Sequence, residues 1–170
     1  MKYKTLIVGI ALAVAAVTGA RAQTGDQAFV TKLAGVAMGE VELGTLAKDK
    51  AASRDVKGFA QRMIDDHSKA GEELKAIAQR KNLTWPSGLA PDAVALKDKL
   101  SKLSGPAFDR AYIDAMVNGH RDVLEVVKTQ AQAGGDAEIK AWAMKATSSV
   151  QAHLTHAQDV QREIGKTATH

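Results

Sequence analysis

The chain has 170 residues, no cysteine, and a formal net charge of +4 from 23 basic and 19 acidic side chains. The lack of cysteine excludes disulfides, thiolate chemistry and attachment to lipid through a cysteine thioether. The sequence contains no basic stripe and no run of like charge, so we expect no nucleic-acid partner.

The first 22 residues have the pattern of a secretory signal peptide. Lys2 and Lys4 give a positive start, residues 6–17 form an uncharged apolar stretch, and residues 20–22 read Ala-Arg-Ala, which suits a cleavage site. A membrane-spanning helix needs about 20 apolar residues, more than this stretch provides. We therefore predict cleavage before Gln23, no membrane span in the mature protein, and a periplasmic or secreted location.

Cleavage would leave residues 23–170, which are 148 of the 170 residues and suffice for one domain with its own core. Three basic residues lie in the removed segment, so 20 of the 23 would remain against 19 acidic ones. The mature chain would then carry a net charge of only +1.

The rest of the chain is predicted to be all-α, because apolar residues recur at steps of three and four. We expect four long helices, at about 26–50, 54–82, 106–133 and 136–164, and a short helix at 91–103. Ser53 and Asp136 are suited to cap the second and fourth long helices. Thr24, with Gln27 three residues later, is suited to begin the first.

The lengths of the connections predict the topology. The first and second long helices are joined by a few residues, as are the third and fourth, so each pair should form an antiparallel hairpin. More than twenty residues separate the second long helix from the third. A crossover of that length is what a ferritin-like four-helix bundle requires. Alternatively, the short helix packs as a fifth element and leaves the order of the four open.

Each long helix carries one polar residue within its apolar stripe and near its middle. These residues are Glu40, His67, His120 and His153. Side chains at matching heights on four packed helices would meet in the core, and imidazole and carboxylate are ligands that Zn, Fe and Cu accept. We expect one transition-metal ion held by these four residues. The alternative is a metal-free cluster in which Glu40 bonds to an imidazole and fixes the helix register.

Several neighbours are candidates to complete or tune this site. Asp66 lies on the edge of the same stripe as His67, and His156 shares a face with His153, so both are possible additional ligands. Met63 and Met116 each lie four residues before a stripe histidine. Thioether beside imidazole would favour copper, although methionine at helical spacing more often fills a core.

Common enzyme motifs are missing from the sequence. It has no nucleophile elbow, no glycine-rich phosphate loop and no zinc-protease histidine pair, so a protein that is not an enzyme is favoured. The residues suggest metal buffering or a role in a stress response. The alternative is a metal-free periplasmic interaction protein or a structural bundle of the cell envelope.

Four segments carry a resemblance to a known family: residues 39–44 (Gly-Glu-Val-Glu-Leu-Gly), residues 59–67 (Phe-Ala-Gln-Arg-Met-Ile-Asp-Asp-His), residues 108–112 (Phe-Asp-Arg-Ala-Tyr) and His120. Together they resemble a bacterial exported ferritin-like family catalogued as domain of unknown function 4142, whose members are often labelled outer membrane proteins. The resemblance covers nearly all of residues 26–162. It implies an exported helical bundle and no established activity. The family pattern falls on Glu40, Asp66, His67, Tyr112, His120 and His153.

The chain departs from di-iron ferritins in its ligands. Those proteins use Glu-x-x-His on two helices and a glutamate on each of the other two. Here Ile64 and Val150 stand three residues before His67 and His153, and the third long helix offers His120 instead of a glutamate. With so few carboxylates, a single ion held mainly by imidazole fits better than a di-iron centre for iron storage.

Overall fold

The computed structural model describes the backbone of residues 11–167 and the side chains of residues 24–166, so Lys2, Lys4 and His170 lie outside it. Within this part the chain is all-helical, with five helices and no strand. The helices are α1 (Ala11–Lys50), α2 (Arg54–Arg80), α3 (Pro91–Ser101), α4 (Gly105–Ala133) and α5 (Ala137–Thr167). No helix in the described part is long and apolar enough to cross a membrane.

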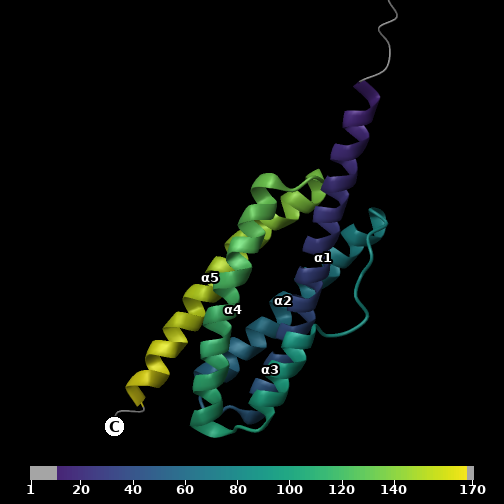
Figure 1. Ribbon diagram of the computed structural model, residues 1–170. Coiled ribbons are helices and arrows are strands. Elements are labelled where there is room, and N and C mark those ends of the chain that lie inside the picture. Colours follow the sequence, from purple (N-terminus) through teal and green to yellow (C-terminus); the bar gives the residue numbers. More distant parts are fainter. Residues whose placement is uncertain (1–10, 168–170) are drawn as a thin grey trace, which may run out of the picture.

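The helices pack as two hairpins, and the crossover lies along one side (Figure 1). The most extensive contacts are those of α1 with α2 and of α4 with α5, as the short connections predicted. The two hairpins meet through α2 against α5 and α1 against α4. The short helix α3 belongs to the long connection between α2 and α4, and it packs mainly along α1.

Two of the three predicted helix starts are confirmed. The Ser53 hydroxyl accepts hydrogen bonds from the backbone N–H groups of residues 55 and 56. The Asp136 carboxylate accepts bonds from those of residues 138 and 139, at 2.9 and 3.1 Å. The predicted start at Thr24 is wrong, because α1 already begins at Ala11. Residues 11–22 are rich in alanine, the best helix former, so the helix extends through the segment that we expect to be removed.

The two hairpins are fastened to each other by one buried aspartate at each end. Asp26 on α1 accepts hydrogen bonds from the Gln130 side chain and from the backbone N–H groups of Gly135 and Asp136, in the turn between α4 and α5. Asp109 on α4 accepts bonds from the backbone N–H groups of residues 52 and 53, in the turn between α1 and α2. Each hairpin thus supplies a carboxylate that accepts from backbone N–H groups in the other hairpin's turn, which have no partner within their own helices.

Gln27 ties α1 to the crossover instead of capping a helix. Its amide accepts a hydrogen bond from the backbone N–H of Thr84 and donates one to the Thr84 carbonyl, at 2.8 and 2.9 Å. The chain reaches this point by ending α2 at Arg80 and passing through Asn82, whose φ of 54° is tolerated well by asparagine. The crossover therefore leaves α2 in a defined direction and returns beside α1.

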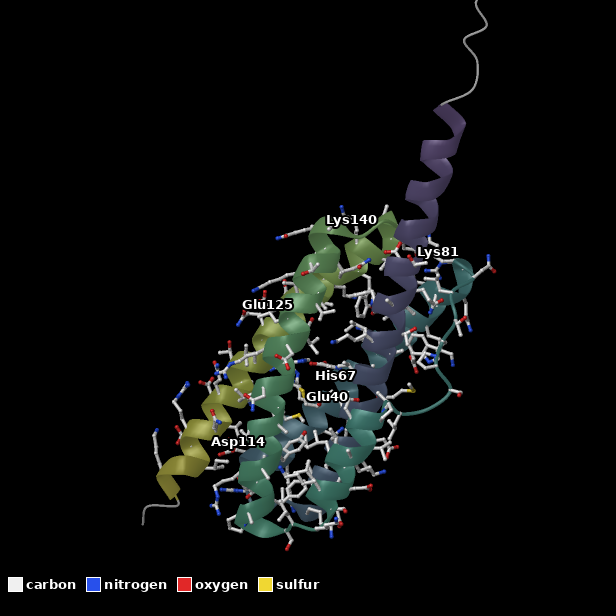
Figure 2. All side chains as sticks on the ribbon, in the orientation of Figure 1. Glu40, His67, Lys81, Asp114, Glu125 and Lys140 are labelled. Atoms are coloured by element: carbon white, nitrogen blue, oxygen red, sulfur yellow. The ribbon has the colours of Figure 1, made fainter. Side chains whose placement is uncertain are left out.

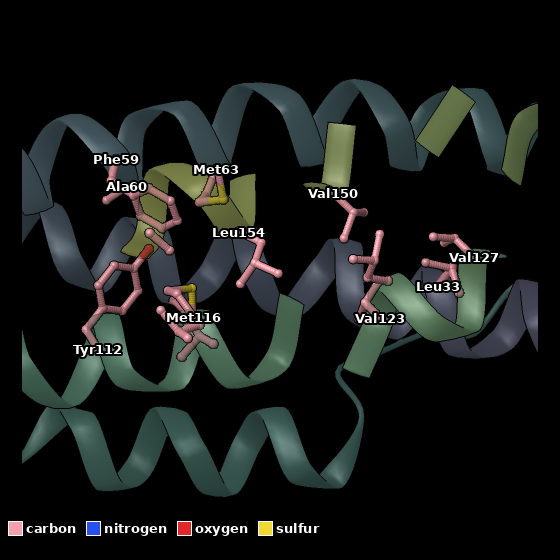
Figure 3. Packing of buried hydrophobic residues seen from close by; sticks show 14 of the residues in the cluster. Leu33, Phe59, Ala60, Met63, Tyr112, Met116, Val123, Val127, Val150 and Leu154 are labelled. Carbon is pink, nitrogen blue, oxygen red and sulfur yellow. The ribbon is translucent and has the colours of Figure 1, made fainter. Parts of the chain in front are cut away.

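Buried hydrophobic side chains from α1, α2, α4 and α5 form one core cluster, part of which Figure 3 shows. Its members include Phe59, Met63, Tyr112, Met116 and Leu154, as well as Leu33, Val123, Val127 and Val150. Gly44 lets α1 and α2 approach closely, because a Cβ there would lie 2.9 Å from Ile64 Cγ1 and 3.0 Å from the Ala60 carbonyl oxygen. His120 falls between Met116 and Val123 on α4, so it is buried among the hydrophobic residues of this core.

Candidate metal centre

Three of the predicted site residues meet in the core. His67 from α2, His120 from α4 and His153 from α5 are 8%, 2% and 2% exposed. Their ring centroids form a triangle with sides of 5.4, 5.6 and 5.8 Å. One nitrogen from each ring lies within 4.8 Å of the other two. Two nitrogens bound to one zinc ion at about 2.1 Å lie at most about 4 Å apart, so the rings stand close to coordinating separation.

The hydrogen bond of His120 defines which of its nitrogens is free. Nδ1 lies 2.8 Å from the carbonyl oxygen of Met116, one helical turn earlier. A carbonyl oxygen can only accept, so Nδ1 carries the proton and donates it. Nε2 is then left with its lone pair, and it is buried without a hydrogen-bond partner. A free lone pair on a fixed ring is what a metal ligand needs.

His153 is oriented by a carboxylate on the neighbouring helix. Its Nε2 lies 2.8 Å from Asp66 Oδ2, and Arg62 lies 3.3 Å from the same oxygen. The imidazole donates from Nε2, and its buried Nδ1 has no partner. Burial raises the pKa of Asp66, but the hydrogen bonds from His153 and Arg62 outweigh this and lower it below its ordinary value. Asp66 therefore orients a histidine and is not part of the triangle.

The imidazoles are neutral at neutral pH. Burial, and then the proximity of His120 and His153, lowers the pKa of His67 to about 3. Burial lowers the pKa of His120 to about 4, against the opposing effect of its bond to Met116. Burial also lowers the pKa of His153, although its bond to Asp66 opposes this. Neutral imidazole is the form that binds metals.

Glu40 lies next to the triangle without joining it. It reaches the core from α1 (Figure 2), and its Oε1 is 4.0 Å from Nδ1 of His120, the nitrogen that already bonds to Met116. Burial raises the pKa of Glu40 to about 8, so the carboxyl is largely protonated at neutral pH. Its Oε2 and the hydroxyl of Tyr112 are both buried without hydrogen-bond partners. Burial, and then Glu40, raises the pKa of Tyr112.

His156 is also outside the triangle. Its ring packs edge-on against Phe59, with the centroids 5.2 Å apart. Its Nδ1 is buried without a partner. Among the described residues, only His67, His120 and His153 form a group of three potential metal ligands within this distance of one another.

The roles of Asp66, Asp109 and Asp26 were not predicted from the sequence. Asp66 was expected as a possible ligand, whereas its bond to His153 spans 87 residues and depends on how α2 and α5 face each other. No role was predicted for Asp109, although its carboxylate binds two N–H groups of the α1–α2 turn, nor for Asp26 at the other end. The signals for Asp109 were its place in the segment 108–112 that carries the resemblance and its position beside Phe108 on the buried face of α4.

The comparisons with known proteins agree with this all-helical fold. The family model described as domain of unknown function (DUF4142) matches residues 11–160. No curated protein matches the chain. Among solved structures, a DUF305 protein of Streptomyces coelicolor that is described as secreted has a TM-score of 0.72 at 18% identity, and the match covers 83% of this chain and 94% of that one.

Two further solved structures share the fold. A DUF305 fragment from Deinococcus radiodurans has a TM-score of 0.72 at 13% identity, over 82% of this chain and 96% of that one. CopM in its Cu(I)-bound form has a TM-score of 0.68 at 18% identity, over 81% of this chain and 96% of that one. At these identities the likeness establishes the fold and nothing more.

Proposed function

Because the chain belongs to the DUF4142 family, whose name assigns no activity, we propose a function from its own site: the protein binds one transition-metal ion at His67, His120 and His153. The observation that carries the proposal is the set of three buried ring nitrogens without hydrogen-bond partners. Each such group costs about 1–3 kcal/mol when it is buried unpaired. A metal ion would satisfy all three at once.

The surroundings of the three histidines support a metal ligand set. The His153–Asp66 hydrogen bond gives the carboxylate–histidine arrangement that accompanies many metal ligands. His120 is fixed in the same way by a backbone carbonyl. Three imidazoles leave a fourth coordination position open. Glu40, whose Oε1 is 4.0 Å from Nδ1 of His120, is the candidate for the fourth ligand.

Imidazole ligands suit Zn, Fe and Cu, so we propose one of these three metals. CopM, which shares the fold, has been solved with Cu(I) bound. This supports metal handling by a bundle of this type. The site lacks the glutamates that di-iron ferritins carry on their helices, which argues against di-iron storage. The proposed role is therefore buffering of a single ion or a stress response.

The architecture and the location belong to the same proposal. We infer a ferritin-like four-helix bundle made of α1, α2, α4 and α5, with α3 in the crossover. We also infer export to the periplasm or beyond, with residues 1–22 removed. Asp26 and Gln27, which fasten α1 to the α4–α5 turn and to the crossover, both follow the expected cleavage site. The contacts of the bundle would therefore survive processing, and Gln23 should be the first residue of periplasmic material.

The test is metal content by mass spectrometry of chain purified from periplasm without a histidine tag. We expect about one ion per chain, retained or regained after incubation with Zn, Cu(I) or Fe(II). The His67→Ala/His120→Ala double variant should contain none. His156→Ala is the matched control, because it also removes a partly buried imidazole but leaves the triangle intact, and it should keep the ion. Circular dichroism would verify that each variant is folded.

One observation favours a second candidate. His120 and His153 each form a hydrogen bond within the chain, to Met116 and to Asp66, and such internal bonds are what a metal-free structural cluster would require. In that case the protein would be an interaction or envelope-structural bundle. An absence of metal in the wild type under every loading condition would reject the metal site and favour this alternative.

A further inference from the structure

A cavity of about 390 Å³ lies between α2 and α5, next to the histidines. His67 and His153 line it at one end, and Leu74 and Trp142 line it towards the turn between α4 and α5. From His67 to Leu74 the helix rises by about 10 Å. The cavity is therefore elongated along the bundle, and its volume is within the usual range for a small-molecule site.

The walls of this cavity are mostly apolar. Leu33 from α1, Leu74 from α2, Val123 from α4 and Val150 from α5 all line it. Trp142 is held there by an edge-on contact with Phe29, with centroids 6.0 Å apart. When an apolar group of a ligand covers apolar surface that the core leaves open, the free energy of the system falls. The interior therefore suits the hydrocarbon part of a ligand.

The mouth of the cavity carries one cation without a partner. Arg62 is paired with Asp66 at 3.3 Å, and Lys145 with Glu73 at 2.9 Å. Lys69 lies between these pairs on α2, lines the cavity, and forms no ion pair among the residues with described side chains.

Ser148 and Ser149 line the cavity from α5, across from Lys69 on α2. Both serines are exposed residues of α5 that line the cavity. The contact between His67 and His153 and the bond between Glu73 and Lys145 fix the register of the two helices. In that register, the serines lie at the level of Lys69. A lysine ammonium and two hydroxyl donors around one opening form a place for an anion.

We propose that this cavity binds a small amphipathic carboxylate, with its carboxylate at Lys69, Ser148 and Ser149 and its apolar chain against Leu33, Leu74 and Val123. The ligand class follows from the charge at the mouth and the apolar walls behind it. A cation of the same shape would meet Lys69 with like charge. The binding does not require a metal ion in the histidine triangle, so this proposal goes beyond the proposed function and can fail or succeed independently of it.

The test is titration of the chelator-treated, metal-free chain with hexanoate, followed by calorimetry and ligand-observed NMR. We expect saturable binding of hexanoate and no saturable binding of hexylammonium. Lys69→Gln should weaken hexanoate binding about fivefold to tenfold, as expected for loss of a charge-assisted bond at an exposed site. Lys57→Gln, an exposed lysine on α2 away from the cavity, should leave the affinity unchanged.

A second variant tests the cavity itself. Ala146 lines it, and Ala146→Phe should fill it and abolish hexanoate binding. Ala141→Phe adds the same ring at an exposed position of α5 outside the cavity, and it should bind hexanoate normally. No binding to the wild type, equal binding of hexylammonium, or full binding to a folded Ala146→Phe variant would each overturn the proposal. Metal titration of the same preparation tests the histidine triangle separately.

Discussion

Buried polar groups occupy two kinds of place in this molecule, and their hydrogen bonding differs. At the ends of the bundle, Asp26 and Asp109 each accept at least two hydrogen bonds from the opposite hairpin. In the middle, by contrast, ring nitrogens of His67, His120 and His153 are buried without partners, as is one oxygen of Glu40.

This difference in hydrogen bonding separates residues that hold the two hairpins together from residues that are available to bind a ligand. Buried polar groups in folded proteins are nearly always hydrogen-bonded, so each exception needs an explanation. The end groups bring two turns together and find their partners within the chain. The three histidines lie together in the core, and His120 and His153 each use one ring nitrogen for a hydrogen bond within the chain. A group of unpartnered ring nitrogens in one place points to a partner from outside the chain.

The largest expected effect is on the pH dependence of stability in the metal-free protein. The folded state keeps the Glu40 proton up to about pH 8, whereas the unfolded chain loses it near 4.5. The folded state therefore binds more protons in this window, and Glu40 makes the free energy of unfolding fall as pH rises. The histidines have the opposite effect on stability. Below pH 6.5 His67 and His120 bind protons in the unfolded chain but stay neutral in the folded protein, so the free energy of unfolding falls as the pH decreases.

Stability should therefore peak near pH 6.5 and fall on both sides, at about 1.4 kcal/mol per pH unit for each group that titrates. Urea unfolding across pH 4–9 would measure it. Glu40→Gln should remove the alkaline fall and leave the acidic fall, whereas Glu42→Gln, at an exposed position of α1, should change neither. An alkaline fall that persists in Glu40→Gln would show that Glu40 is not the cause.

The next largest effect concerns the ends of the bundle. Asp109→Ala leaves two backbone N–H groups of the α1–α2 turn without their acceptor, and it should reduce the free energy of unfolding by about 2–4 kcal/mol. Asp26→Ala should cost a similar amount. Asp114→Ala, on the exposed face of α4, should change stability by less than about 0.5 kcal/mol. Equal effects of Asp109→Ala and Asp114→Ala would contradict the fastening role.

The periodicity of the sequence predicted most of the fold, because each long helix buries one continuous stripe. His67, His120 and His153 were found in the same way, as interruptions of those stripes. The start of α1 was mispredicted because Thr24 has the residue type of a cap, whereas the alanine-rich segment before it continues the helix. The preference of threonine for a capping position did not outweigh the helix propensity of the alanine-rich segment.

The partners of the buried groups could not be predicted from the sequence. The bonds of Asp26 span 104 to 110 residues, and that between His153 and Asp66 spans 87. Such pairs depend on the rotation of each helix about its axis, which a hydrophobic stripe defines only loosely. The same uncertainty explains why Glu40, expected among the ligands, lies beside His120 and outside the triangle.

A smaller effect is expected from the residue that orients His153. Asp66→Asn replaces the charged carboxylate that accepts from Nε2 with a neutral amide, so the ring loses its charge-assisted bond and part of its basicity. Metal affinity should fall about 10- to 100-fold, as is usual when such a partner is lost. Asp65→Asn, at the neighbouring exposed position, should leave affinity unchanged. Competition titration with a chelator would measure both, and equal affinities would remove Asp66 from the site.

The smallest effect distinguishes the two regions most directly. His120→Leu replaces a buried imidazole that has one unpaired nitrogen with an apolar side chain of similar size. Removing that unpaired group should offset the lost bond to Met116, and stability of the metal-free protein should rise by up to about 1 kcal/mol. Metal binding should be lost. A fall in the free energy of unfolding as large as that expected for Asp109→Ala would mean instead that the central histidines stabilise the fold as the aspartates at the ends do.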